Sequence, residues 1–135
     1  MKKKQIKLVK NKFNVKNSHK KYKICKLYIK TTLNNTFITL TDLKGNVLFF
    51  YSAGKFGFKG SKKSTNYVAE YIFSYIIRNC INLKIKGLFI YINGISNRVK
   101  NSIKKIKTPK IRIFSIYNNT PIKFNGCRAP KPRRI

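Results

Sequence analysis

Acidic side chains are almost missing from this sequence. Asp42 and Glu70 are the two carboxylates among 135 residues, against 32 lysines and arginines. A nuclease that holds two metal ions needs several carboxylates, and a general acid–base pair needs a histidine with an acidic partner. The one histidine, His19, lies in a lysine-rich segment far from either acid in the sequence. We therefore predict that the chain is not an enzyme, uses no metal or other cofactor and has no small-molecule substrate.

Cysteine pairs with the spacing of a zinc site or a disulfide framework are missing too. Cys25, Cys80 and Cys127 are odd in number and far apart, and neither Cys-x-x-Cys nor His-x-x-x-His occurs. We expect reduced thiols, with Cys25 packed in a strand and Cys80 packed in a helix.

Long apolar runs are also lacking. The longest, such as residues 47–51 and 88–92, are far shorter than the roughly 20 residues that span a bilayer. The basic residues do not follow one face of a long amphipathic helix, as an interfacial anchor would require. We therefore predict no membrane partner.

Positive charge is what the sequence has in excess. The formal net charge is +30, and the basic residues extend along the whole chain with denser clusters at both ends. Like charges at this density repel one another in a compact chain unless a polyanion neutralises them. Nucleic acid is the first candidate for that polyanion. Charge alone would equally suit a protein that compacts DNA or RNA without specificity, which is the alternative function.

The residue types that dominate the composition indicate an A/T-rich genome, often an organellar one. The chain has 26 lysines against 6 arginines and is rich in Ile, Asn, Phe and Tyr, whose codons are A/T-rich. The N-terminus lacks the Arg- and Ser-rich amphipathic character of a transit peptide. If the protein works in an organelle, we expect it to be made there.

Apolar periodicity predicts the order β-β-β-α-β-α-β. Alternation and short apolar runs indicate strands, and an apolar stripe at helical spacing indicates each helix. The strands are expected at 24–32, 36–41, 47–51, 88–92 and 111–117. One helix is expected at 66–83, capped by Thr65, and a second after a short loop at 93–97, ended by Pro109. The 47–51 run is apolar enough to predict burial on both faces.

These elements predict an α/β fold with a five-stranded mixed sheet. The first three strands form an antiparallel meander, and the strand–helix–strand units give right-handed crossovers with parallel pairing. Helices pack on the sheet. The predicted organisation is a basic N-terminal extension at 1–23, an α/β RNA-binding domain at 24–117 and a basic, proline-containing tail at 118–135.

A glycine- and lysine-rich loop at 54–65 is the most specific local feature. Its glycines let the backbone approach a phosphate, its lysines add charge, and the following helix start presents N–H groups. Phe56 and Phe58 either stack on unpaired bases or fill gaps in the core. The register of a nucleotide-binding P-loop is absent.

Two further polar segments are candidates for RNA contact. Asn34-Asn35-Thr36 forms a polar hairpin tip, for which an ordinary turn is the alternative. The segment 125–134 combines stiffening prolines with arginines, which bind phosphate and stack on bases. We interpret it as an arm that threads into RNA, with a solvated disordered end as the alternative.

Several of these segments together resemble a known family. They are Asn-Asn-Thr-Phe-Ile-Thr-Leu-Thr-Asp at 34–42, Gly45-Asn46, Ser52-Ala53-Gly54, the run 57–65 and Asn-Gly-Cys-Arg at 125–128. From about residue 24 to the end, the chain is similar to the universal family of small ribosomal subunit protein eleven. The extension before residue 24 resembles a lineage-particular addition.

This resemblance implies a structural ribosomal protein that supports translation. The family binds small-subunit rRNA of the platform near the mRNA exit side, beside small-subunit proteins seven, eighteen and twenty-one. Its architecture is ribonuclease-H-like without the active site. Together with the composition, the resemblance favours a mitochondrial, organelle-encoded form. A plastid or the cytoplasm of an A/T-rich bacterium is the alternative.

The family's rRNA contacts carry over to the hairpin tip, the loop and the tail. Gly94 and Arg98 match a family run before the second helix, which adds Arg98 to the candidates. The predicted RNA-binding residues are Asn34, Asn35, Thr36, Lys55, Phe56, Gly57, Phe58, Lys59, Gly60, Ser61, Lys62, Lys63, Ser64, Thr65, Arg98, Asn125, Gly126, Cys127, Arg128, Lys131, Arg133 and Arg134.

Overall fold

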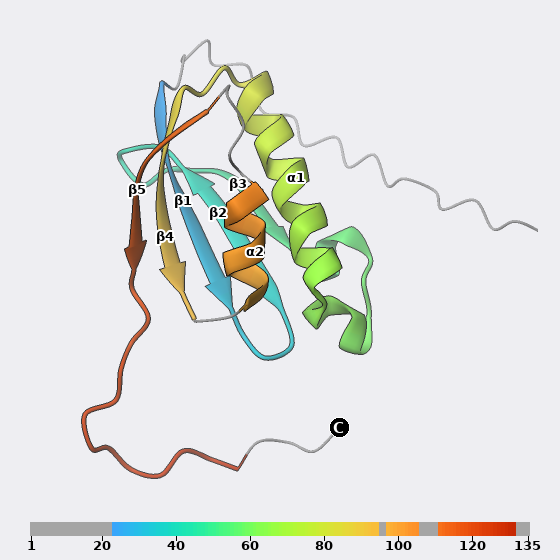
Figure 1. Ribbon diagram of the computed structural model, residues 1–135, viewed down its shortest axis with the longest axis vertical. Helices are drawn as coiled ribbons and strands as arrows, with labels where there is room; N and C mark the ends of the chain where they lie inside the picture. Colours follow the sequence, from blue (N-terminus) through green and yellow to red (C-terminus); the bar gives the residue numbers. More distant parts are fainter. Residues whose placement is uncertain (1–22, 95–96, 106–110, 132–135) are drawn as a thin grey trace, which may run out of the picture.

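A computed structural model describes residues 23–94, 97–105 and 111–131 of the chain. In these ranges the order of elements is the predicted β-β-β-α-β-α-β (Figure 1). The elements are β1 (Ile24–Thr31), β2 (Thr36–Thr41), β3 (Val47–Ser52), the 3-10 turns η1 (Gly54–Phe56) and η2 (Gly60–Ser64), α1 (Asn66–Asn82), β4 (Gly87–Asn93), α2 (Asn97–Lys105) and β5 (Arg112–Asn118).

The five-stranded sheet of the described residues has the order β3-β2-β1-β4-β5. β1, β2 and β3 pair antiparallel, while β4 pairs parallel with β1 and with β5. The predicted mixed sheet is therefore confirmed, and β1, β3, β4 and β5 all run in one direction. The ribonuclease-H-like label stays a prediction.

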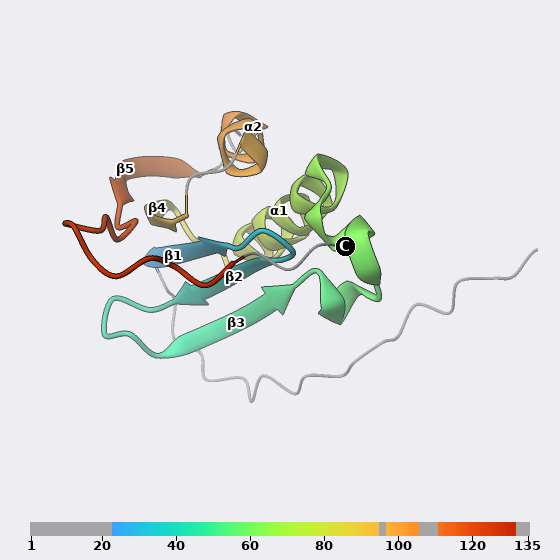
Figure 2. The same cartoon turned by 90° about the horizontal axis from the view of Figure 1, so that it is seen from below.

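The two helices lie on the same face of the sheet. α1 connects β3 to β4 and α2 connects β4 to β5, so both connections cross the sheet in the same direction. Connections that share one hand and one direction place their helices on one side. Figure 2 shows both helices above the sheet, and no helix of the described residues covers the opposite face. We call that opposite side the open face.

The core lies between the sheet and α1. Inward positions alternate along β1 and β2, and α1 contributes one stripe at helical spacing. The largest fully buried side chains are Phe73, Leu27, Ile29, Ile38, Leu40, Ile72, Ile76, Leu88, Ile90, Val68 and Thr36. In α2, Val99 and Ser102 are buried. Two features of the predicted second helix, Ile106 on its apolar face and Pro109 at its end, lie outside the described residues.

Cys25 in β1 and Cys80 in α1 are buried in this core, as predicted. Burial raises the pKa of the Cys25 thiol to about 11, with a smaller contribution from Asp42. Burial also raises the pKa of the Cys80 thiol to about 12, with a contribution from Cys25. Both groups therefore remain protonated near neutral pH and pack as small apolar side chains.

The prediction that residues 47–51 are buried on both faces is wrong. β3 is an edge strand that pairs with β2 alone. Val47 is 61% exposed and Phe50 is 47% exposed, while Phe49 and Tyr51 pack against the core. An apolar run shows that a strand can be buried, but its position in the sheet decides how much of it is covered.

Gly94, at the end of β4, occupies a position that a larger residue would strain. Its φ is +94°, and a Cβ there would meet the carbonyl and hydroxyl oxygens of Thr31. Gly45, in the turn after β2, has the same φ of +94° but open space around it. The pair therefore separates the cost of the backbone conformation from the cost of close packing.

We expect Gly94→Ala to destabilise the fold more than Gly45→Ala. The φ value costs about 1–3 kcal/mol at either position, and the clash with Thr31 adds a second cost of about 1–3 kcal/mol at Gly94 alone. Thermal unfolding of the full chain, followed by circular dichroism in a sulfate buffer that screens its charge, measures the difference. Equal melting temperatures for the two variants would contradict the close approach of Gly94 to β1.

Candidate nucleic-acid interface

One edge of the sheet gathers segments that are far apart in the sequence. Because β1, β3, β4 and β5 run in the same direction, their carboxyl ends reach the same edge, which we call the carboxyl edge (Figure 1). The hairpin tip, the 53–65 loop, the link from β4 to α2 and the start of the tail follow these four ends. Both helices also begin at this edge. The fold thus brings the predicted RNA-binding segments to one side.

Hydrogen bonds within the chain shape the hairpin tip. The Thr32 amide donates to the Asn35 carbonyl at 2.9 Å, and the Asn35 side-chain oxygen accepts from the Thr36 amide at 2.9 Å. Asn34 is exposed and Asn35 is half-buried, whereas Thr36 is buried. Asn34 and Asn35 can therefore offer side chains to a ligand, while the Thr36 side chain belongs to the core.

Arg98 supports the tip from the β4–α2 side. One guanidinium nitrogen, Nη2, donates to the Thr32 carbonyl at 3.0 Å and to the Leu33 carbonyl at 3.3 Å. The residue is half-buried. The sequence predicted that Arg98 contacts RNA directly. In the structure its guanidinium positions the hairpin tip, and contact with RNA stays a prediction.

We expect Arg98→Lys to loosen the tip although the positive charge is kept. The two N–H groups of Arg98 Nη2 are fixed in the guanidinium plane, whereas a lysine ammonium rotates freely on a flexible stem and holds two carbonyls in a less defined geometry. Hydrogen exchange of the Asn35 and Thr36 amides in the full chain should therefore accelerate by about fivefold to tenfold, which corresponds to the loss of about one hydrogen bond.

Lys100→Arg is the matched control, because Lys100 is an exposed residue of the same helix. It should leave exchange at the tip unchanged. Unaltered exchange in Arg98→Lys as well would show that Arg98 does not hold the tip.

The glycine-rich 53–65 loop folds as two short 3-10 turns, η1 and η2. Gly57 and Gly60 adopt φ values of +82° and +55°, which favour glycine. Ser64 Oγ donates to the Ser61 carbonyl at 2.8 Å. Thr65 caps α1 as predicted, because its Oγ1 accepts from the Val68 amide at 3.4 Å.

The four lysines of the loop differ in their surroundings. Lys59 and Lys62 are exposed, and Lys63 is half-buried. The Lys55 ammonium donates to the Phe50 carbonyl at 2.9 Å and lies 4.9 Å from the centre of the Tyr51 ring. Lys55 thus fastens the loop to β3, whereas Lys59, Lys62 and Lys63 present charge at the carboxyl edge beside the start of α1.

Phe56 and Phe58 are half-buried in an aromatic cluster. The Phe56 ring centre lies 5.6, 5.5 and 5.2 Å from those of Tyr51, Tyr71 and Tyr75, and Phe58 lies 6.1 Å from Tyr71. Burial raises the pKa of Tyr51 to about 12, with contributions from Tyr75. These contacts favour the gap-filling alternative for both phenylalanines, and their stacking on RNA bases stays a prediction.

The tail is anchored where it leaves the sheet. The Asn119 amide donates to the Ile92 carbonyl at 2.7 Å, and the Gly94 amide donates to Thr120 Oγ1 at 3.1 Å. Residues 121–131 are exposed and extend away from the fold, including Asn125, Gly126, Cys127, Arg128 and Lys131. Arg133 and Arg134 lie outside the described residues.

Of the two acids, only Glu70 lies near the carboxyl edge, so positive charge predominates there. Asp42 lies in the turn at the opposite end of β2, where its carboxylate accepts from the Leu43 amide at 2.7 Å. Glu70 is half-buried in the second turn of α1. The amino ends of both helices add partial positive charge at the carboxyl edge. This edge can therefore bind phosphate through ammonium groups and backbone N–H groups together.

The described residues were also compared with the requirements of a metal site and of a membrane-spanning helix. Within it, no three histidine, cysteine or acidic side chains gather in a way that could hold a metal ion. Within the same ranges, no helix has both the length and the apolar character needed to cross a bilayer.

Two groups of residues were not predicted from the sequence. Thr31 and Thr120 join the strand ends through Gly94, and neither residue lies in a motif that would have indicated this. The aromatic residues of the open face, such as Tyr28 and Tyr91, form the second group. Their outward positions in alternating strands were the available signal.

Comparison with known proteins gives one consistent result. The family described as ribosomal protein S11 matches residues 25–134. A small ribosomal subunit protein uS11 of Orientia tsutsugamushi is 39% identical over 109 residues, covering 81% of this chain and 86% of that protein. The uS11m protein of Prototheca wickerhamii is 40% identical (81% and 85% covered). The uS11 protein of Carsonella ruddii is 42% identical (81% and 92% covered).

Proposed function

The chain belongs to the ribosomal protein S11 family, and from this membership we propose that it braces the rRNA of the small-subunit platform near the mRNA exit side. The family is one of structural ribosomal proteins, and the chain is not an enzyme. The observation that carries the proposal is the convergence of three candidate RNA-binding segments and Arg98 at the carboxyl edge. An interface of this kind supports translation by holding RNA in shape.

The proposed mechanism is electrostatic and geometric. Exposed lysines of the 53–65 loop neutralise phosphates and release their counterions. The hairpin tip, held by Arg98, offers amide side chains to a folded RNA surface. The exposed tail, with Arg128 and Lys131 in its described part, follows the RNA away from the sheet. Residues 1–23 and 118–135 would act as basic extensions of a 24–117 domain.

The expected protein partners follow from the family. We place the chain beside small-subunit proteins of types seven, eighteen and twenty-one. For location we propose the mitochondrion. The A/T-rich character of the composition supports this, as does the 40% identity to a relative named uS11m. Bacterial relatives of similar identity keep a plastid or an A/T-rich bacterium as the alternatives to be tested.

Replacement of Lys59, Lys62 and Lys63 by glutamine should weaken rRNA binding and reduce its salt dependence. Each lost phosphate contact lowers the slope of log K against log salt by about 0.7–0.9, so the three together should lower it by about 2 to 3. Binding of the full chain to small-subunit rRNA across a salt series measures this slope.

A triple variant with the same loss of charge is the matched control. Lys44, Lys84 and Lys86 are exposed, in the turn after β2 and the link before β4. Both segments lie at the edge opposite the carboxyl edge. Their replacement by glutamine should change the slope much less. Equal slopes in the two triple variants, with no preference for rRNA over random duplex, would favour the non-specific compacting protein instead.

The ribosomal role predicts where the endogenous protein is found. In extracts of purified mitochondria resolved on a sucrose gradient, it should move with small subunits and stay with them at moderate salt, because many phosphate contacts act together. Its recovery in plastid or bacterial small subunits would correct the location alone. Its recovery mainly as free protein would contradict the proposed function.

A further inference from the structure

Aromatic rings line up across the open face of the sheet. Tyr28 of β1 is in register with Tyr91 of β4, which is in register with Tyr117 of β5. The ring centres of each neighbouring pair are 4.9 Å apart, and the planes meet at 17° and 18°. On the other side of β1, Phe37 and Phe50 stack with centres 6.3 Å apart. The open face therefore has a tyrosine stack over β1, β4 and β5 and a phenylalanine stack over β2 and β3, in addition to the stacked pair Phe89 and Phe114.

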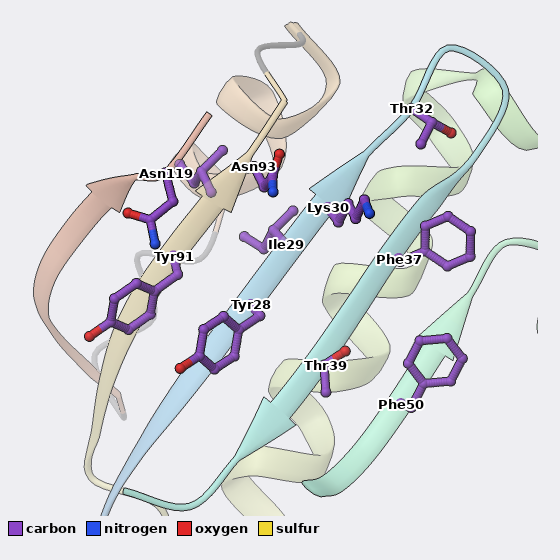
Figure 3. A pocket seen from close by; sticks show the side chains of 11 residues that line it. Tyr28, Ile29, Lys30, Thr32, Phe37, Thr39, Phe50, Tyr91, Asn93 and Asn119 are labelled. Atoms are coloured by element: carbon purple, nitrogen blue, oxygen red, sulfur yellow. The ribbon is translucent and has the colours of Figure 1, made fainter. Parts of the chain in front are cut away.

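A groove of about 510 Å³ lies between the two stacks. Tyr28 and Tyr91 line one side of it, and Phe37 and Phe50 line the other, while Lys30 and Thr39 lie between them (Figure 3). In the view of Figure 3 onto the open face, the rings of Phe37 and Phe50 turn a flat side outward, away from the sheet. The size of the groove and its flat rings suit a flat aromatic ligand.

The polar residues of the groove complete this match. Asn93 and Asn119 line it near the carboxyl edge, and amide groups can donate to and accept from the edge of a base. Lys30 supplies positive charge, and neither carboxylate of the chain lines the groove. Thr32 also lines it, immediately before the hairpin tip, so the groove is continuous with the proposed RNA interface.

The aromatic side chains of the groove are accessible. Tyr28 is 39% exposed, and Phe50 is 47% exposed. Exposed apolar rings gathered on one face mark an interaction surface rather than a solvent-facing one. The groove combines aromatic rings, two amide side chains and a lysine, and no carboxylate lines it. This lining suits a nucleotide better than an apolar protein segment, because a nucleotide combines a flat ring, a polar edge and an anionic backbone.

We propose that this groove binds an unpaired RNA base, which stacks on the aromatic rings of the groove at Tyr28 and Phe50. The amides of Asn93 and Asn119 contact the base edge, and Lys30 contacts the sugar–phosphate backbone. The RNA strand leaves the groove past Thr32 and continues along the hairpin tip. This inference rests on the proposed rRNA-binding function and adds to it a site that recognises bases rather than phosphates.

The test compares two probes that carry the same backbone charge. One is a short single-stranded oligouridylate, and the other is an abasic strand of equal length. The full wild-type chain should bind the base-containing strand more tightly. Tyr28→Leu and Phe50→Leu remove a ring but keep apolar bulk. Each should reduce that preference by about tenfold, within the range known for base–aromatic stacking, and leave the salt slope unchanged.

Two control variants sharpen the comparison. Phe114→Leu removes a ring of matching exposure, 46%, from the same sheet but outside the groove, and it should keep the full base preference. Tyr28→Phe keeps the ring and should also keep the preference. Thermal unfolding of every variant shows whether it remains folded.

Ultraviolet crosslinking in native small subunits gives a measurement that needs no variant. A nucleotide adduct on Tyr28, Phe37, Phe50 or Tyr91, located by mass spectrometry, supports the proposal. A peptide of another protein attached at these residues in place of a nucleotide would overturn it, because the occupant would then be a protein.

The outcomes separate this inference from its premise. Equal binding of both strands by the wild-type chain, or an undiminished base preference in Tyr28→Leu and Phe50→Leu, would overturn the groove alone. Binding of neither strand at low salt would overturn the RNA-binding function and the groove together.

Discussion

The shared direction of β1, β3, β4 and β5 decides where every candidate RNA-binding segment lies. Four strands that run the same way deliver four connections to one edge, although the residues concerned range from the hairpin tip near residue 34 to the tail after residue 118. The same topology brings the amino ends of α1 and α2 to that edge. Convergence therefore follows from chain direction and the handedness of crossovers, and attraction between the segments is not needed.

This arrangement concentrates positive charge at the carboxyl edge. The fold alone does not offset the repulsion between these charges. The core under α1 is apolar and closely packed, yet a chain with a net charge of +30 repels itself at every surface. A polyanion that binds the folded state stabilises it by mass action. The position of Asp42 at the far end of β2 fits this division, because a carboxylate at the carboxyl edge would weaken phosphate binding there.

Periodicity and turn chemistry predicted the elements well, because each depends on neighbours in the sequence. Thr65 caps α1 and Cys80 lies inside, both as the local patterns indicated. The features that the sequence mispredicted or left open depend on neighbours in space. Burial of β3 depends on whether a strand lies beyond it, and the packing of Phe56 depends on Tyr71 and Tyr75 from a later helix. The groove depends on strand order, which alternation along one strand does not contain.

The number of basic residues overstates how many phosphates this fold can bind. Two cations of the chain bind carbonyl groups of its own backbone, one at the hairpin tip and one on the edge strand β3. Arg98 holds the carbonyls of Thr32 and Leu33, and Lys55 holds that of Phe50. These two cations shape the interface, and their direct contact with RNA stays a prediction. Recognition of RNA phosphates then depends on which lysines remain exposed at the carboxyl edge. Charge does not distinguish one base from another, and the aromatic rings of the open face can add that selectivity.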